Sequence, residues 1–173
     1  MKKITFSVLL VLAVFFFSAC SQGKEEKQSV PTTDRPFSSS ISIAYKDLSY
    51  KANLTFRNSA SATLEITSPE NISGLIFTLS NDNLSARYEG LDFPLDTLDS
   101  RTKTAAGMLF SAIANAGASK NVKVDREKNE FSVSNKIYSY KYTMIFDKTS
   151  GAIKSFSVPD EELFISFSNF SFL

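Results

Sequence analysis

The sequence predicts a mainly β fold of the α+β class, built from an antiparallel meander of strands and one amphipathic helix. Apolar and polar residues alternate along most of the chain from residue 39 onward, which is the pattern of half-buried strands. Turn residues separate these runs at roughly ten-residue intervals, a spacing typical of antiparallel sheets. One segment, at about 101–116, has the period of a helix instead. The 173 residues are enough for one domain with a substantial core.

The composition excludes several classes of function. The chain carries 19 Lys and Arg against 18 Asp and Glu, so it lacks the basic excess of a nucleic-acid-binding protein. It has no His and one Cys, which rules out a Ser-His-Asp triad, a Cys-His pair, a His-ligated metal and an internal disulfide. We therefore expect neither an enzyme nor a bound cofactor or metal. The acidic run at 160–162 follows a proline and is interpreted as a solvated turn.

Residues 1–19 have the features of an export signal. Lys2 and Lys3 precede an apolar run from residue 4 to residue 17. A helix of that length spans roughly 21 Å, which is short of the roughly 30 Å of a bilayer core. Length and flanking charge therefore favour a signal peptide over a transmembrane helix.

The signal ends in Phe17-Ser18-Ala19-Cys20, which resembles the lipobox of bacterial lipoproteins. The resemblance implies cleavage before Cys20 and attachment of a diacylglycerol to its sulfur. Phe17 departs from the aliphatic residue that is usual at that position. The alternative is an uncleaved signal anchor with an inert Cys. Two or three acyl chains would hold the protein stably at a membrane. We therefore expect an extracytoplasmic protein anchored to the cell membrane, or to an outer membrane where one exists.

Residues 20–38 are predicted to be the lipidated Cys and a flexible linker, and residues 39–173 the folded domain. The linker is polar, carries charges of both signs and contains two prolines, Pro31 and Pro36. Such a segment buries too little apolar surface to offset the entropy lost on ordering.

The first half of the domain is predicted to contain five strands. The clearest is Tyr50–Phe56, in which Tyr50, Ala52, Leu54 and Phe56 alternate with polar residues. Turns are predicted at 68–71 and 81–83, where Pro, Asn and Asp are concentrated. The five runs are Ile41–Tyr45, Tyr50–Phe56, Leu64–Ile66, Leu75–Leu79 and Leu84–Tyr88.

The helix is predicted at about 101–116. Asp99 or Ser100 is the expected cap at its start, and Gly117 is expected to end it in the left-handed conformation. Its apolar stripe is rich in Ala and therefore allows a close approach to a sheet. The stripe consists of Ala105, Met108, Leu109, Ala112, Ile113 and Ala116.

The second half is predicted to contain five more strands. A hairpin loop is expected at Asp147–Gly151, with positive φ at the glycine. The last strand has Phe164, Phe170 and Phe172 on one face and Leu163, Ile165 and Phe167 on the other, so we expect it to be central or covered. The five runs are Val122–Val124, Phe131–Val133, Ile137–Phe146, Ala152–Val158 and Leu163–Phe172.

The order of these features resembles the LolA/LolB-like lipoprotein carrier superfamily, and in particular its lipoprotein members without assigned function. The matching phrases are the turn Ser68-Pro69-Glu70 before a strand and the hairpin Asp147–Gly151 leading into Ile153. The resemblance covers about residues 40–173. It implies a strongly bent antiparallel sheet, or half-barrel, with the helix against its concave face. It also implies that the concavity holds acyl chains or another lipid.

The chain contains 16 Phe and 6 Tyr but no Trp, and most of these rings are expected to fill the core. Tyr138, Tyr140 and Tyr142 share one face of a predicted strand, and phenol groups suit the polar end of a lipid. Together with Met108 and Phe77, they are the candidate ligand-binding residues.

Two functions remain open from the sequence. One is a lipoprotein, anchored through Cys20, that binds a lipid or other hydrophobic ligand in a half-barrel cavity. The other is a structural or partner-binding envelope lipoprotein whose core is filled by its own side chains. The first requires an apolar pocket of a few hundred Å³. The second predicts an exposed apolar patch or a sheet edge that pairs with an envelope protein.

Overall fold

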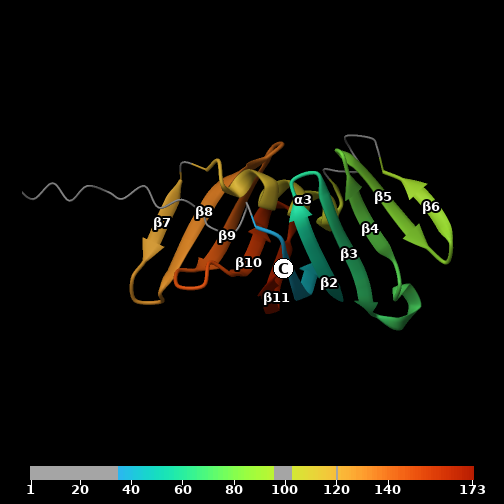
Figure 1. Cartoon of the computed structure of the whole chain (residues 1–173), viewed down its shortest axis with the longest axis horizontal. Coiled ribbons are helices and arrows are strands. Elements are labelled where there is room, and N and C mark those ends of the chain that lie inside the picture. The colour runs from blue at the N-terminus through green and yellow to red at the C-terminus, as the bar shows by residue number, and fades with distance from the viewer. Residues whose placement is uncertain (1–34, 96–102, 120) are drawn as a thin grey trace, which may run out of the picture.

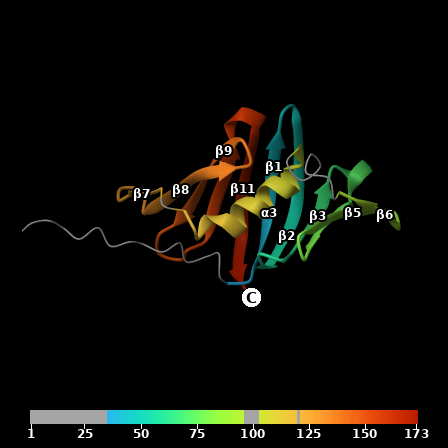
Figure 2. The same cartoon turned by 90° about the horizontal axis from the view of Figure 1, so that it is seen from above.

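The computed structural model describes residues 35–95, 103–119 and 121–173, which form one open antiparallel sheet and one α-helix. Figures 1 and 2 show that the sheet is strongly bent and that the helix lies on its concave face. The predicted half-barrel fold is therefore confirmed. The strands are β1 Phe37–Tyr45, β2 Leu48–Asn58, β3 Ser61–Ser68, β4 Ile76–Ser80, β5 Asn83–Tyr88, β6 Leu91–Pro94, β7 Val122–Asp125, β8 Glu130–Ile137, β9 Tyr140–Asp147, β10 Ile153–Val158 and β11 Leu163–Phe172.

The sheet consists of two meanders joined in the middle. The strand order is β6-β5-β4-β3-β2-β1-β11-β10-β9-β8-β7, so the first and last described strands are neighbours. β1 and β11 pair antiparallel, from Phe37 opposite Phe172 to Tyr45 opposite Leu163. Short 3₁₀ turns lie at Glu70–Ile72 and Pro159–Glu161. Because β11 lies at the centre of the sheet, the expectation of a central final strand is confirmed.

The helix α3, Ala105–Ala116, packs into the concavity between the two wings of the sheet (Figure 2). Five of the six residues in its predicted stripe are buried, and Ala105 is half-buried. The core is continuous across the helix and both meanders. It includes Phe37, Leu54, Leu64, Leu109, Ile113, Phe146, Phe156 and Ile165.

The ends of the helix differ from the prediction. Thr104 is the N-cap, and its Oγ1 accepts a hydrogen bond from the Gly107 N–H at 3.1 Å. Asp99 and Ser100, the caps predicted from the sequence, lie outside the described residues. Gly117 has φ −63° and ψ −26°, so it extends the right-handed path and does not adopt the predicted left-handed conformation. The carbonyls of Asn115 and Ala116 accept from the N–H groups of the following turn instead.

The predicted strand over Ile137–Phe146 is confirmed from Tyr140 onward, as β9, but is wrong at its start. Ile137 ends β8, Tyr140 begins β9, and Tyr138 lies in the two-residue turn between them. Tyr138 has φ +56°, a left-handed conformation that is uncommon in non-glycine residues. The residue type therefore gave no indication of the turn. The tyrosines therefore do not form one continuous stripe along a strand.

The predicted faces of β11 also need correction. Its register against β1 shifts between Ser38 and Ser40, and Asn169 has φ +51°. This bulge reverses the alternation. Phe170 and Phe172 consequently pack against the core, as Phe167 does, while Phe164 is half exposed on the other face. The strand is central but is not apolar on both sides.

Two boundaries are also placed differently by the structure. β1 begins at Phe37, inside the predicted linker of residues 20–38, and Phe37 is completely buried. β6 follows Gly90 as a strand that the sequence analysis did not predict. The loop at 147–151 is as predicted, with Gly151 at φ +74°. The side chain of Asp147 stabilises it by accepting hydrogen bonds from the Thr149 and Ser150 N–H groups at 3.0 and 2.8 Å.

Candidate functional site

Two open pockets follow one another along α3. The first, here called the apolar pocket, lies at the start of the helix and has a volume of about 230 Å³. The second, here called the polar pocket, lies further along the helix and has a volume of about 420 Å³. The polar pocket has the few-hundred-Å³ size that the ligand-binding hypothesis requires, and the apolar pocket is somewhat smaller.

The apolar pocket is lined by residues of β1 to β4, the 3₁₀ turn Glu70–Ile72 and the start of the helix. Most of its lining side chains are aliphatic or aromatic, and several are only half-buried. The Tyr45 hydroxyl donates a hydrogen bond to the Lys103 carbonyl at 3.3 Å and so links β1 to the helix start. The lining residues are Ile43, Tyr45, Tyr50, Leu64, Ile66, Ile72, Leu75, Phe77, Lys103, Thr104, Ala105 and Ala106.

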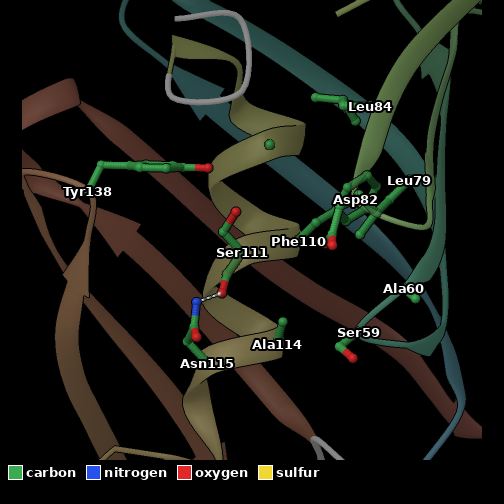
Figure 3. Close-up of a pocket in the computed structure, with 11 residues that line it drawn as sticks. Ser59, Ala60, Leu79, Asp82, Leu84, Phe110, Ser111, Ala114, Asn115 and Tyr138 are labelled. Atoms are coloured by element: carbon green, nitrogen blue, oxygen red, sulfur yellow. Dashed lines mark hydrogen bonds between the residues drawn. The ribbon is translucent and has the colours of Figure 1, made fainter. Parts of the chain in front are cut away.

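The polar pocket lies beside the part of α3 that carries Phe110, Ser111, Ala114 and Asn115 (Figure 3). Asp82 and Leu79 form one wall, and Tyr138 extends toward the helix from the other side. Two short turns supply several of these residues, because Ser59 and Ala60 connect β2 to β3, and Asp82 lies between β4 and β5. The remaining lining residues are Leu84 and Gly107.

The five candidate residues from the sequence are not gathered into one site. Phe77 lines the apolar pocket, and Tyr138 lines the polar pocket. Met108 and Tyr142 are buried in the core, and Tyr140 is half-buried against it. The stripe of tyrosines is thus divided between the polar pocket and the packed interior.

Tyr142 is a packing residue whose hydroxyl is held inside the protein. Its O–H donates to the Ala112 carbonyl of α3 at 3.4 Å, and its ring lies 5.9 Å from that of Phe156. Burial raises the pKa of Tyr142 to about 12. The phenol therefore stays protonated at physiological pH and ties the helix to β9.

Sequence reasoning missed most of the apolar pocket. Tyr45, Tyr50 and Leu75 were assigned to strands, and Ile72 lies just after the turn predicted at 68–71. A usable signal was present, since these large apolar residues lie close to strand ends or turns, where a helix covers them less completely. Each of the four is only partly buried in the structure.

The fold and the pockets define an open half-barrel that leaves apolar space at one end of its helix. No family model matches the chain, and no curated protein sequence matches it. Among solved structures, an uncharacterized conserved protein from Thermus thermophilus is similar with a TM-score of 0.50 and 8% identity. That match covers 81% of this chain and 80% of the other.

Two further solved structures are similar over most of the chain. A LolA superfamily protein from Nitrosomonas europaea has a TM-score of 0.40 and 11% identity, covering 81% of this chain and 86% of its own. The structure of the CwlD amidase from Clostridioides difficile in complex with the GerS lipoprotein gives a TM-score of 0.46 and 11% identity, covering 82% and 88%. The open, bent antiparallel sheet with one helix is the half-barrel that the sequence predicted, and the likeness to these structures concerns the fold alone.

Proposed function

We propose that the protein is an extracytoplasmic, membrane-anchored lipoprotein that binds a hydrophobic ligand in the apolar pocket. The observation that carries the proposal is the pocket itself. The core beside it is filled, with Leu64 and Ala106 almost fully buried, yet Tyr50, Leu75 and Phe77 remain partly uncovered around about 230 Å³ of open space. Uncovered apolar surface in a concave site is typical of ligand binding.

The size of the pocket limits what it can hold. Its volume is below the roughly 300–1,000 Å³ of sites for drug-sized ligands. It is therefore suited to one acyl chain, or to part of one, and too small for a lipid with two chains. Each methylene that leaves water for this pocket would contribute about 0.8 kcal/mol.

Membrane anchoring is proposed from the sequence. Cys20 follows the apolar signal and precedes a polar segment of residues 21–34. Residues 1–34 lie outside the described part of the chain, and no helix in the described part has the length and hydropathy needed to cross a membrane. A thioether lipid on Cys20 would supply the attachment and would place the half-barrel near a membrane that could provide its ligand.

Ligand binding is tested by filling the pocket with a larger side chain. Ala105 is half-buried and lines the apolar pocket. We expect Ala105→Phe to weaken the binding of the neutral dye N-phenylnaphthylamine at least about tenfold, because the new ring takes the place of the dye. Fluorescence titration of the chain from Ser21 onward measures this, since the core is formed from residues between Phe37 and Phe172.

Ala114→Phe is the matched control. Ala114 lies on the same helix and is also half-buried, but it lines the polar pocket. We expect it to change dye affinity less than about twofold. If the unaltered chain bound no dye and carried no lipid after purification, ligand binding would be excluded. The structural or partner-binding lipoprotein would then be the better explanation, to be pursued by pull-down from envelope extracts.

Anchoring is tested at Cys20. We expect Cys20→Ser to abolish the incorporation of radiolabelled palmitate and to move the protein from the membrane fraction to the soluble fraction, since the thioether has no sulfur on which to form. Ser21→Ala, a change at the neighbouring residue, should leave labelling intact. Labelling of the Cys20→Ser chain equal to that of the unaltered chain would contradict the lipobox assignment.

A further inference from the structure

We propose that the ligand is an amphiphile with an ammonium head, whose tail lies in the apolar pocket and whose head lies in the polar pocket. This inference rests on the proposed function and names the class of ligand. Three features carry it: the alignment of the two pockets, the chemistry of the polar pocket, and the backbone conformation of the residues on its two sides.

The pockets are consecutive along the same elements. Residues 103–106 line the apolar pocket, and α3 residues between Gly107 and Asn115 line the polar one. On β4, Phe77 belongs to the first and Leu79, two residues further along the same face, to the second. The stretch of helix from 105 to 115 is roughly 15 Å long. One elongated molecule lying along α3 would therefore contact both pockets.

The charge of the polar pocket is negative. Asp82 is the charged side chain among the described residues that line it, and none of those residues is Lys or Arg. The Asn115 Nδ2 group donates to the Ser111 carbonyl at 2.8 Å, as Figure 3 shows. Asn115 therefore has its Oδ1, an acceptor, and one remaining N–H left for a ligand. A carboxylate and an amide oxygen suit a ligand head that is cationic and rich in N–H donors.

Tyr138 adds an aromatic ring to this environment. It is 45% exposed, and in Figure 3 it extends toward the helix, on the opposite side from Asp82. An ammonium group near a tyrosine ring is attracted by the negative face of the π system. A carboxylate head in the polar pocket, by contrast, would be repelled by Asp82 and would find no Lys or Arg among the described residues that line this pocket.

Both of these side chains come from two-residue turns with left-handed backbone. Asp82 has φ +66° in the turn between β4 and β5, and Tyr138 has φ +56° in the turn between β8 and β9. Each turn is two residues long, with Ser80 opposite Asn83 and Ile137 opposite Tyr140. Left-handed backbone is tolerated by Asp but is unfavourable for Tyr. Tyr138 therefore keeps a less favoured backbone conformation at the polar pocket.

The experiment compares three probes with the same tail and different heads: dodecylamine, dodecanol and dodecanoate. Each displaces N-phenylnaphthylamine from the chain that begins at Ser21. We expect dodecylamine to act at about threefold to tenfold lower concentration than dodecanoate, with dodecanol between them. The preference should shrink as salt is added, because Asp82 is exposed and its charge is screened.

Asp82→Asn removes the charge and keeps a residue that tolerates positive φ. We expect it to reduce the preference for amine over carboxylate to within about twofold while dodecanol binding stays unchanged. Asp160→Asn makes the same change of charge at the exposed turn after β10 and should leave the preference intact.

Lysophosphatidylethanolamine then distinguishes two sources of the ammonium. Displacement as effective as that by dodecylamine indicates a phospholipid head, and weaker displacement indicates an amine without phosphate.

Failure of this inference can be separated from failure of the proposed function. Equal displacement by dodecylamine and dodecanoate, or a preference that survives Asp82→Asn, would overturn the ammonium head while dye binding still supported a hydrophobic ligand. If the unaltered chain bound neither the dye nor any of the three probes, the proposed function would fail and this inference with it.

Discussion

Replacing Phe37 with alanine is expected to lower the free energy of unfolding by about 3–5 kcal/mol. Phe37 is completely buried. Its ring stacks on Phe56 of β2 with centroids 5.5 Å apart and on Phe170 of β11 with centroids 4.7 Å apart. Truncation would open a cavity where the two meanders join. Urea denaturation, followed by circular dichroism, measures the loss.

Phe164→Ala is the control for this change. Phe164 is also a phenylalanine and lies on β11, the strand next to β1, but it is 50% exposed on the face away from the core. Its truncation should cost about 1 kcal/mol or less. A loss for Phe37→Ala no larger than that for Phe164→Ala would show that the folded domain begins after residue 38, as the sequence analysis proposed.

The prediction that Phe37 belongs to the linker followed from the residues beside it. Pro36 precedes it and three serines follow it, so no local alternation identifies a strand there. What orders this segment is its pairing with β11, illustrated by the Ser39 hydroxyl, which donates to the Ser168 carbonyl at 2.7 Å across 129 residues of sequence. Pairing between such distant segments leaves no pattern in either one alone.

Where the determinants were local, the prediction was successful. Tyr50, Ala52, Leu54 and Phe56 alternate with polar residues, and they do form one face of β2. The apolar stripe of α3 was identified from its period because a helix on a sheet must bury one face. The loop at 147–151 was identified because Gly151 supplies the positive φ that the turn requires.

The failures share a physical cause. Tyr138 and Asn169 both adopt positive φ, and each changes the direction in which the following residues point. Neither residue is a glycine, so the residue type does not indicate the turn or the bulge. Once Asn169 breaks the alternation, Phe170 and Phe172 move to the core side of β11, although strict alternation places them beside Phe164.

The candidate site was harder to predict than the fold. A list of large apolar residues does not tell which of them fill the core and which surround open space. Met108 and Tyr142 fill the interior, whereas Tyr50 and Leu75 remain at the edge of the apolar pocket. The difference depends on where α3 lies in the concavity, and that position is set by the packing of the helix on both meanders at once.

The position of the helix can be tested at Leu109. We expect Leu109→Ala to cost about 2–5 kcal/mol of unfolding free energy, because this side chain is completely buried in the core cluster between helix and sheet. Chemical denaturation gives the value. Asn115→Ala, at an exposed position on the same helix, should change stability by no more than about 0.5 kcal/mol. A cost below about 1 kcal/mol for Leu109→Ala would contradict the packing of α3 in the concavity.

The same variant tests whether ligand binding in both pockets depends on the packing of α3. Residues of α3 line both pockets, so a helix loosened by Leu109→Ala should lose affinity for the neutral dye and for dodecylamine alike. Asp82→Asn should alter only the preference for dodecylamine over dodecanoate, because it leaves the helix in place. If one packed helix positions both pockets, Leu109→Ala should lose stability and affinity for both the dye and dodecylamine. Asp82→Asn should not lose stability or affinity for the dye.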